Sequence, residues 1–222
     1  MNKEKSLFNQ EAVDEIKKVY ADFKGEIKNR LKEFRDLGRY GSKEEIFTEL
    51  TFCLLTPQSK AIICWRAVEN MVRNGILLKG NAKEIQENLK GVRFKYKKAE
   101  YIVTAREQYF NGNNPIFYYI KNSEDPFKLR DYLIKNVKGL GCKEASHFLR
   151  NIGLGHDLAI LDRHILKNLR KLRVIENSSK SYTEKKYLRI EKKMREFSKL
   201  VEIPMDHLDL TLWAKEAGEV FK

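Results

Sequence analysis

The chain has 222 residues, and its 44 lysines and arginines outnumber its 31 aspartates and glutamates, for a formal net charge of +13 at pH 7. This charge favours a polyanionic partner such as nucleic acid, although a generally lysine-rich proteome would produce a similar excess. No run of about 18 apolar residues occurs, and no segment joins a basic face to a continuous apolar one, so the sequence predicts no contact with a membrane.

The three cysteines, Cys53, Cys64 and Cys142, are odd in number and lie in apolar or helical surroundings. This arrangement is typical of free thiols in a reducing cytoplasm rather than of a disulfide framework. No Cys-x-x-Cys pair occurs and the histidines lack metal-ligand spacing, so we expect neither a zinc ion nor an iron–sulfur cluster. The first residues are too polar for a secretory signal, and we expect a cytoplasmic protein.

In the first half of the chain, apolar residues recur at helical spacing and no segment alternates as a strand does. The predicted helices cover residues 11–37, 43–55, 58–73, 82–89 and 97–110. Ser42 and Glu45 have the spacing of a capping box for the second helix, and Thr56-Pro57 ends it. Residues 111–126 carry the densest turn signals and predict a loop.

In the second half, a helix reaches Gly139-Leu140-Gly141, and the next helix begins at about Cys142. Residues 153–161 predict a connection, and Asp162 predicts the N-cap of the following helix. Two more helices are expected over residues 183–200 and 205–217. The predicted fold is therefore all-α, with one helical lobe from residues 1–40 and 163–222 and another from residues 41–162.

The Gly139-Leu140-Gly141 turn predicts a helix-hairpin-helix motif over about residues 128–153. Each glycine allows a positive φ and lets a ligand approach the backbone closely. The amides that begin the second helix can then hold a phosphate oxygen, helped by the helix dipole. A plain helical hairpin with a glycine cap is the simpler alternative.

Lys143 and Asp162 are the candidate reactive residues. Lys143 lies in the first turn of the second hairpin helix, where the dipole disfavours a positive charge and favours the neutral amine that covalent catalysis needs. The helix after Lys143 rises about 15 Å, and the nine-residue connection can span up to about 30 Å, so the chain can return to the hairpin. Asp162 could act only as a cap, but a capping carboxylate can also stabilise a developing positive charge.

These features resemble the helix-hairpin-helix DNA glycosylase superfamily, and within it the type 2 branch of prokaryotic 8-oxoguanine DNA glycosylase/AP lyases. The resemblance covers nearly the whole chain. It includes Phe52-Cys53-x-Leu55-Thr56, Arg93-Phe94, residues 97–102, Gly141-x-Lys143-Glu144-Ala145-Ser146-His147-Phe148-Leu149-Arg150-Asn151, residues 159–164, and Leu208-Asp209-Leu210 with Trp213.

The resemblance implies the helix-hairpin-helix glycosylase (HhH-GPD) fold and a monomer that excises 8-oxoguanine from double-stranded DNA without a metal or organic cofactor. In this family the damaged nucleotide is flipped out and a lysine, here Lys143, attacks the anomeric carbon. An aspartate, here Asp162, stabilises the oxocarbenium-like transition state. A Schiff base then forms, and β-elimination nicks the strand.

The resemblance also implies roles for residues outside the hairpin. The phosphate and backbone contacts would come from Gly139, Gly141, His164, Arg93 and Lys97, with Lys98 as a further phosphate candidate. Gln58, where the branch usually has Asn, would enter the gap left by the flipped nucleotide. The base pocket would contain Trp213, Asp209 and Lys222.

Each of these residues also has a simpler interpretation. His164 would be a surface histidine, Gln58 part of a helix cap, Trp213 a core residue, Asp209 a solvated side chain and Lys222 a frayed end. Two other functions stay open at this stage. One is a glycosylase for another oxidised base, and the other is a non-catalytic hairpin module that grips the duplex backbone.

Overall fold

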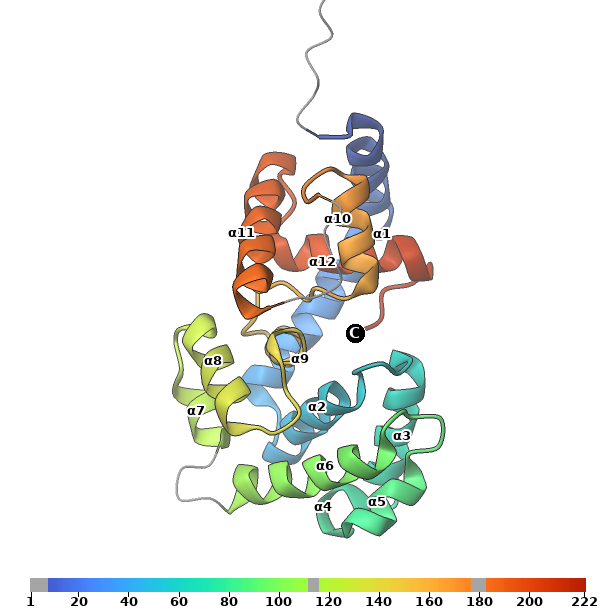
Figure 1. Ribbon diagram of the computed structural model, residues 1–222, viewed down its shortest axis with the longest axis vertical. Coiled ribbons are helices and arrows are strands. Elements are labelled where there is room, and N and C mark those ends of the chain that lie inside the picture. The colour runs from blue at the N-terminus through green and yellow to red at the C-terminus, as the bar shows by residue number, and fades with distance from the viewer. Residues whose placement is uncertain (1–7, 112–115, 177–182) are drawn as a thin grey trace, which may run out of the picture. The chain divides into compact units, whose positions relative to one another are not determined.

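The computed structural model describes residues 8–111, 116–176 and 183–222, and all regular secondary structure in these residues is helical (Figure 1). The helices are α1 (Gln10–Tyr40), α2 (Lys43–Leu55), α3 (Ala61–Arg73), α4 (Ile76–Lys79), α5 (Ala82–Asn88), α6 (Lys95–Phe110), α7 (Ile116–Asn122), α8 (Pro126–Asn136), α9 (Cys142–Asn151), α10 (Arg163–Lys171), α11 (Glu184–Val201) and α12 (Met205–Ala217). The predicted all-α fold is confirmed. None of these helices has the length and apolar character needed to cross a bilayer.

The chain divides into two compact units. The hairpin unit consists of residues 34–155, and the terminal unit consists of residues 8–33 and the described part of residues 156–222. The predicted lobes have their boundaries after residues 40 and 162, and the units have theirs after residues 33 and 155. Lys143 therefore lies in the hairpin unit and Asp162 in the terminal unit.

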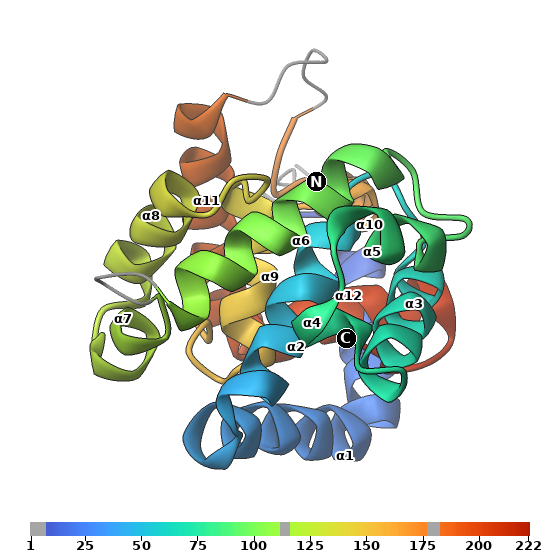
Figure 2. The ribbon, with the colours of Figure 1, turned by 90° about the horizontal axis from the view of Figure 1, so that it is seen from below.

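Helix α2 forms the centre of the hairpin unit, where it packs against α3, α6 and α9 (Figure 2). The predicted capping box opens it: the Ser42 hydroxyl accepts a hydrogen bond from the Glu45 amide at 3.1 Å, and the Glu45 carboxylate accepts one from the Ser42 amide at 2.8 Å. From Leu50 to Thr56 every residue is buried. The end of α2 is thus fixed in the core, and it carries the loop that follows to the surface.

A buried polar chain joins α9 to α2. The Asn151 amide donates to the Glu49 carboxylate at 3.0 Å, and the Arg150 guanidinium donates to the Asn151 carbonyl oxygen at 3.0 Å. All three side chains are buried, so the loss of one of these hydrogen bonds would leave a buried polar group unpaired and would destabilise the unit. These contacts hold the second helix of the hairpin against the central helix.

The predicted loop over residues 111–126 is wrong for residues 116–122, which form α7. Ile116 and Ile120 lie four residues apart and are both buried, and the Phe117 ring packs against Tyr109 with centroids 5.7 Å apart. The apolar run therefore outweighs the turn residues on either side of it. Residues 112–115, which carry several of those turn signals, lie outside the described residues.

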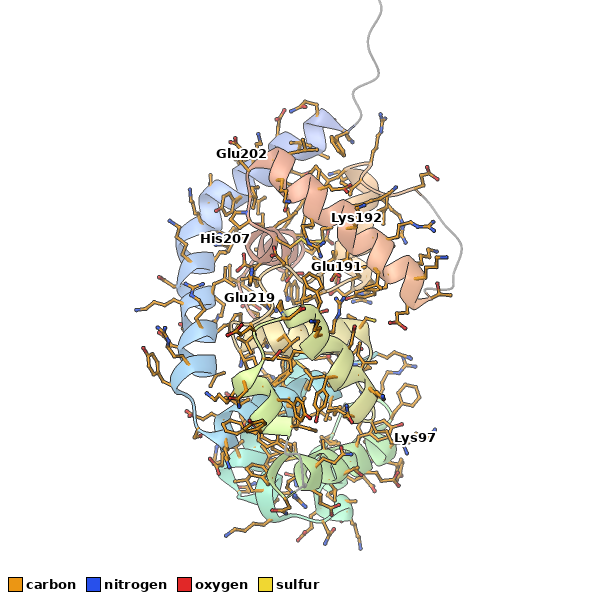
Figure 3. The ribbon with its side chains drawn as sticks, turned by 90° about the vertical axis from the view of Figure 1, so that its left-hand side faces the viewer. Lys97, Glu191, Lys192, Glu202, His207 and Glu219 are labelled. Atoms are coloured by element: carbon orange, nitrogen blue, oxygen red, sulfur yellow. The ribbon has the colours of Figure 1, made fainter. Side chains whose placement is uncertain are left out.

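In the terminal unit, α12 packs against α10 and α11 (Figure 1). Buried Glu191 on α11, labelled in Figure 3, accepts a hydrogen bond from the Ala159 amide at 2.9 Å. The Tyr187 hydroxyl donates to the Ala159 carbonyl at 2.6 Å. These two bonds fix the connection that leads to Asp162.

Candidate active site

The hairpin turn is open to solvent at both glycines. Gly139 and Gly141 are exposed, whereas Leu140 between them is buried. Gly139 has φ of +98°, and a Cβ atom there would lie 2.5 Å from Cδ2 of Tyr101. Gly141 is the N-cap of α9 and provides no side chain to cap it. The turn therefore requires glycine at position 139 and leaves backbone amides available to an anion.

Lys143 lies in the first turn of α9, as predicted, with its side chain 23% exposed. Its Nζ donates to the Thr56 hydroxyl at 3.4 Å and lies 3.7 Å from Oε1 of Glu144. The amine is thus held against the end of α2, on a side chain that is partly exposed. Sequence reasoning treated Thr56 only as part of a helix break and missed its contact with the lysine.

The loop after α2 brings Gln58 and Arg93 to the same region of the hairpin unit. Gln58 is exposed and has φ of +55°, an uncommon conformation for a residue with a side chain. The hydroxyl of the next residue, Ser59, accepts a hydrogen bond from the Arg93 amide at 3.0 Å. Both predicted DNA-contacting side chains are therefore exposed close to Ser59.

The two neighbouring lysines of α6 have opposite environments. Lys97 is exposed, as expected of a phosphate contact, and Figure 3 shows it at the outer edge of the unit. Lys98 is only 4% exposed, and its Nζ donates to the carbonyls of Leu55 and Pro57, each at 2.7 Å. The prediction that Lys98 contacts phosphate is wrong, because its ammonium group is bonded inside the protein.

Asp162 caps α10, as predicted. Its Oδ1 accepts hydrogen bonds from the amides of His164 and Ile165, each at 2.8 Å. Both bonds use the same oxygen, so Oδ2 lies outside the cap. The carboxylate is therefore held in a fixed orientation with one oxygen that can face a positive charge.

His164 is half-buried, and its side chain contacts Trp213, Glu216 and Arg163, whose Nε donates to His164 Nε2 at 3.0 Å. Its ring stacks on Trp213, with centroids 5.9 Å apart and an interplanar angle of 11°. Its Nδ1 lies 3.5 Å from Oε2 of Glu216. Lys167 donates a hydrogen bond to the same oxygen, and Asn168 donates one to Oε1. The bond from Lys167, followed by that from Asn168, holds the pKa of Glu216 at about 2 against an ordinary value of 4.5. Sequence reasoning missed Glu216, which gave no signal beyond its position one turn after Trp213.

The predicted pocket residues of α12 and the following segment lie in the terminal unit. The Trp213 indole donates from Nε1 to the main-chain oxygen of Lys222 at 3.2 Å, so the segment after α12 folds back onto the indole. Asp209, one turn before Trp213, is 3% exposed, and the interpretation of this aspartate as a solvated side chain is wrong. The structure thus brings His164, Trp213 and Lys222 together around one aromatic stack.

The cysteines are free thiols: Cys53 and Cys64 are buried and Cys142 is half-buried. Within residues 8–111, 116–176 and 183–222, no group of three or more His, Cys, Asp or Glu side chains could hold a metal ion.

Comparison with known proteins identifies the family. The family model for 8-oxoguanine DNA glycosylase, Ogg-HhH, matches residues 27–203. The 8-oxoguanine DNA glycosylase/AP lyase of Fusobacterium nucleatum subsp. nucleatum is 46% identical over 213 residues, which cover 96% of this chain and 98% of the relative.

Two solved structures are also similar. The crystal structure of the 8-oxoguanine DNA glycosylase of Thermotoga maritima has a TM-score of 0.85 and 34% identity, and the match covers 96% of this chain and 99% of the other. That of the Methanocaldococcus jannaschii 8-oxoguanine glycosylase/lyase, in complex with a 15mer DNA containing 8-oxoguanine, has a TM-score of 0.85 and 36% identity, with coverage of 95% and 99%. The chain belongs to the 8-oxoguanine DNA glycosylase family.

Proposed function

We propose that this protein is an 8-oxoguanine DNA glycosylase/AP lyase that removes 8-oxoguanine from double-stranded DNA and nicks the strand at the resulting site. Full-length similarity to relatives with that activity supports the proposal. The structural observation that carries it is the partly exposed side chain of Lys143, which lies in the first turn of α9, two residues beyond Gly141 of the exposed turn.

In the proposed reaction, Lys143 is the nucleophile. Its neutral nitrogen forms a bond to C1′ of the flipped nucleotide as the bond from C1′ to N9 breaks, and the base leaves with the electron pair and takes up a proton. The sugar ring then opens to a protonated imine. Loss of a C2′ proton breaks the bond to the 3′ phosphate and completes the lyase step.

Asp162 is proposed to stabilise the positive charge that develops on the sugar before the new bond is complete. Its capping bonds to His164 and Ile165 support this role, because they fix the carboxylate without using its second oxygen. Lys143 and Asp162 belong to different units, so their joint action rests on their motif positions and on the local geometry of each.

DNA contacts are proposed for both units. In the hairpin unit, the amides at Gly139 and Gly141 would bind a phosphate, and Gln58, Arg93 and Lys97 would contact the duplex around it. In the terminal unit, His164 would contact a phosphate. Trp213, Asp209 and Lys222 would form the pocket for the extruded base.

Recognition of 8-oxoguanine requires an acceptor for its N7 hydrogen, because guanine would leave such an acceptor unpaired. The main-chain oxygen of Lys222 accepts a hydrogen bond from the Trp213 indole and is a candidate for this acceptor. We also propose that the protein acts as a monomer in the cytoplasm.

Borohydride trapping with a duplex that contains 8-oxoguanine tests this function. We expect a covalent complex with the parent protein and none with Lys143→Gln. Lys138→Gln is the matched control, since this exposed lysine precedes the hairpin turn and should retain trapping. Trapping by Lys143→Gln would contradict the proposed nucleophile, and trapping only with oxidised pyrimidines would contradict the proposed substrate.

Asp162→Asn separates the roles of the carboxylate. Asparagine caps a helix as well as aspartate does, so the variant should fold and bind the duplex. It should lose most turnover because the negative charge is gone. Turnover equal to that of the parent would show that Asp162 is only a cap.

A further inference from the structure

Lys98 is a buried lysine whose ammonium group is bonded entirely within the hairpin unit. Its Nζ donates to the carbonyls of Leu55 and Pro57 at 2.7 Å each and to the Ser59 hydroxyl at 3.2 Å. These three bonds use the three donors that a lysine has. Burial of a charge is costly without such bonds, and here burial lowers the pKa of Lys98.

The acceptors of Lys98 surround the residue that contacts Lys143. Leu55 and Pro57 are the two neighbours of Thr56, and the Thr56 hydroxyl accepts the hydrogen bond from the Lys143 amine. The Leu55 carbonyl also accepts a hydrogen bond from the Cys64 thiol at 3.2 Å, and burial raises the pKa of that thiol to about 11, which keeps it a donor. The backbone on both sides of Thr56 is therefore tied to the core by side chains of α3 and α6.

The same ammonium group reaches the exposed part of the loop. Ser59 accepts hydrogen bonds from both Lys98 and the Arg93 amide, and it directly follows Gln58, which has the left-handed φ of +55°. Release of Lys98 would remove one hydrogen bond from the Ser59 hydroxyl and one from the Pro57 carbonyl, and would leave only the bond from the Arg93 amide to Ser59 and the longer 3.4 Å bond from the Ser59 hydroxyl to the Pro57 carbonyl. The loop conformation that presents Gln58 depends on those two anchors.

We propose that Lys98 is a positioning residue that clamps residues 55–59 and thereby holds the Thr56 hydroxyl against the Lys143 amine. The inference rests on the proposed function, since it concerns the nucleophile of that reaction. Its consequence is that the DNA-facing loop and the nucleophile form one rigid assembly. A shift of Gln58 on DNA would then be transmitted to Thr56 and to the position of the reactive amine.

The test compares Lys98→Met with Lys83→Met. Methionine is unbranched and only one atom shorter than lysine, but it lacks the charge and the donors. Exposed Lys83 on α5 controls for the loss of one positive charge. The single-turnover trapping rate at saturating 8-oxoguanine duplex should fall about 10- to 100-fold in Lys98→Met, because misplacement of a reacting group by about 1 Å costs up to about 100-fold. The dissociation constant should change less than the trapping rate does, because a buried ammonium contacts no phosphate and Gln58 is the only proposed DNA contact in the clamped loop. Lys83→Met should leave both quantities within about twofold of the parent.

A double-mutant cycle distinguishes positioning from general destabilisation. Thr56→Val removes the hydroxyl at nearly constant shape. If Lys98 acts through Thr56, the trapping rate of Lys98→Met/Thr56→Val should equal that of the slower single variant. Fully additive losses, or a folded Lys98→Met variant that traps at the parental rate, would overturn the inference.

Ser59→Ala provides a milder perturbation if Lys98→Met fails to fold. It removes one of the three acceptors of Lys98 and should lower the trapping rate about threefold or more, and an unchanged rate would overturn the clamp. A parent protein that forms no trapped complex would instead refute the proposed function. The two failures are therefore distinguishable.

Discussion

Gly139→Ala tests whether the hairpin turn needs glycine for its backbone conformation, for space, or for both. The φ of +98° imposes strain on any residue with a Cβ, at a cost of about 1–2 kcal/mol. The new Cβ would also lie 2.5 Å from Cδ2 of Tyr101 and 3.3 Å from Cδ2 of Leu54. Overpacking of this kind costs about 1–3 kcal/mol, so the expected loss in free energy of unfolding is about 2–5 kcal/mol.

Gly75→Ala is the matched control. Gly75 has φ of +68°, but a Cβ there would have no heavy atom within 4 Å. This variant should lose only the backbone contribution of about 1–2 kcal/mol. The difference between the two variants therefore isolates the collision with Tyr101, which we expect to cost about 1–3 kcal/mol.

Urea denaturation measures the free energy of unfolding of both variants, and duplex binding measures the effect on the turn. Gly139→Ala should also weaken binding to DNA, because the collision with Tyr101 would move the turn whose amides are proposed to bind a phosphate. Equal destabilisation of the two variants would refute the collision argument. A destabilised Gly139→Ala variant with parental affinity would show that this turn does not bind the phosphate.

Three further changes test the packing and the pocket. Tyr109→Phe removes a buried hydroxyl that has no hydrogen-bond partner among the described residues. The free energy of unfolding in urea should therefore stay equal or rise by up to about 1 kcal/mol. A loss of more than about 1 kcal/mol would show that the hydroxyl makes a stabilising hydrogen bond. Glu216→Gln should reduce the stability by about 1 kcal/mol at neutral pH. The pKa of Glu216 is about 2 in the folded protein, and its ordinary value is 4.5. The stabilising contribution of the carboxylate is therefore fully present above pH 4.5 and is lost as the pH falls toward 2. Parent and variant should have equal free energies of unfolding in urea at low pH, and a constant difference would contradict the charge effect. Trp213→Phe removes the hydrogen bond from the indole to Lys222. It should slow 8-oxoguanine excision about threefold or more and leave strand nicking at a preformed abasic site unchanged. An equal loss of both activities would place Trp213 outside the base pocket.

Features that depend on neighbours in sequence could be predicted well. Ser42 and Glu45 form their capping box, and Asp162 caps α10, because both motifs depend on residues within one helical turn. The error at residues 116–122 has a different cause. The turn residues on either side predict a loop, whereas the burial of Ile116 and Ile120 depends on helices elsewhere in the unit.

Contacts between distant segments could not be predicted in detail. The stacking of His164 on Trp213 joins α10 to α12, and the bond from Trp213 to Lys222 depends on the path of the chain after α12. The spacing of these residues in sequence carries no information on such contacts. The resemblance to a known family supplied these residues, and their local periodicity did not.

Lys97 and Lys98 are adjacent lysines on α6, but one is exposed and the other is buried. A helix turns by about 100° per residue, so adjacent residues face different directions. Lys98 has the spacing of the apolar face that continues through Ile102, Ala105 and Tyr109, all of which are buried. That register places Lys98 in the core, whereas the phosphate contact predicted for both lysines rests on their position near the matched Arg93-Phe94 segment. A lysine on the apolar face of a helix needs acceptors inside the protein, and the carbonyls at the end of α2 meet that need beside the residue that contacts the nucleophile.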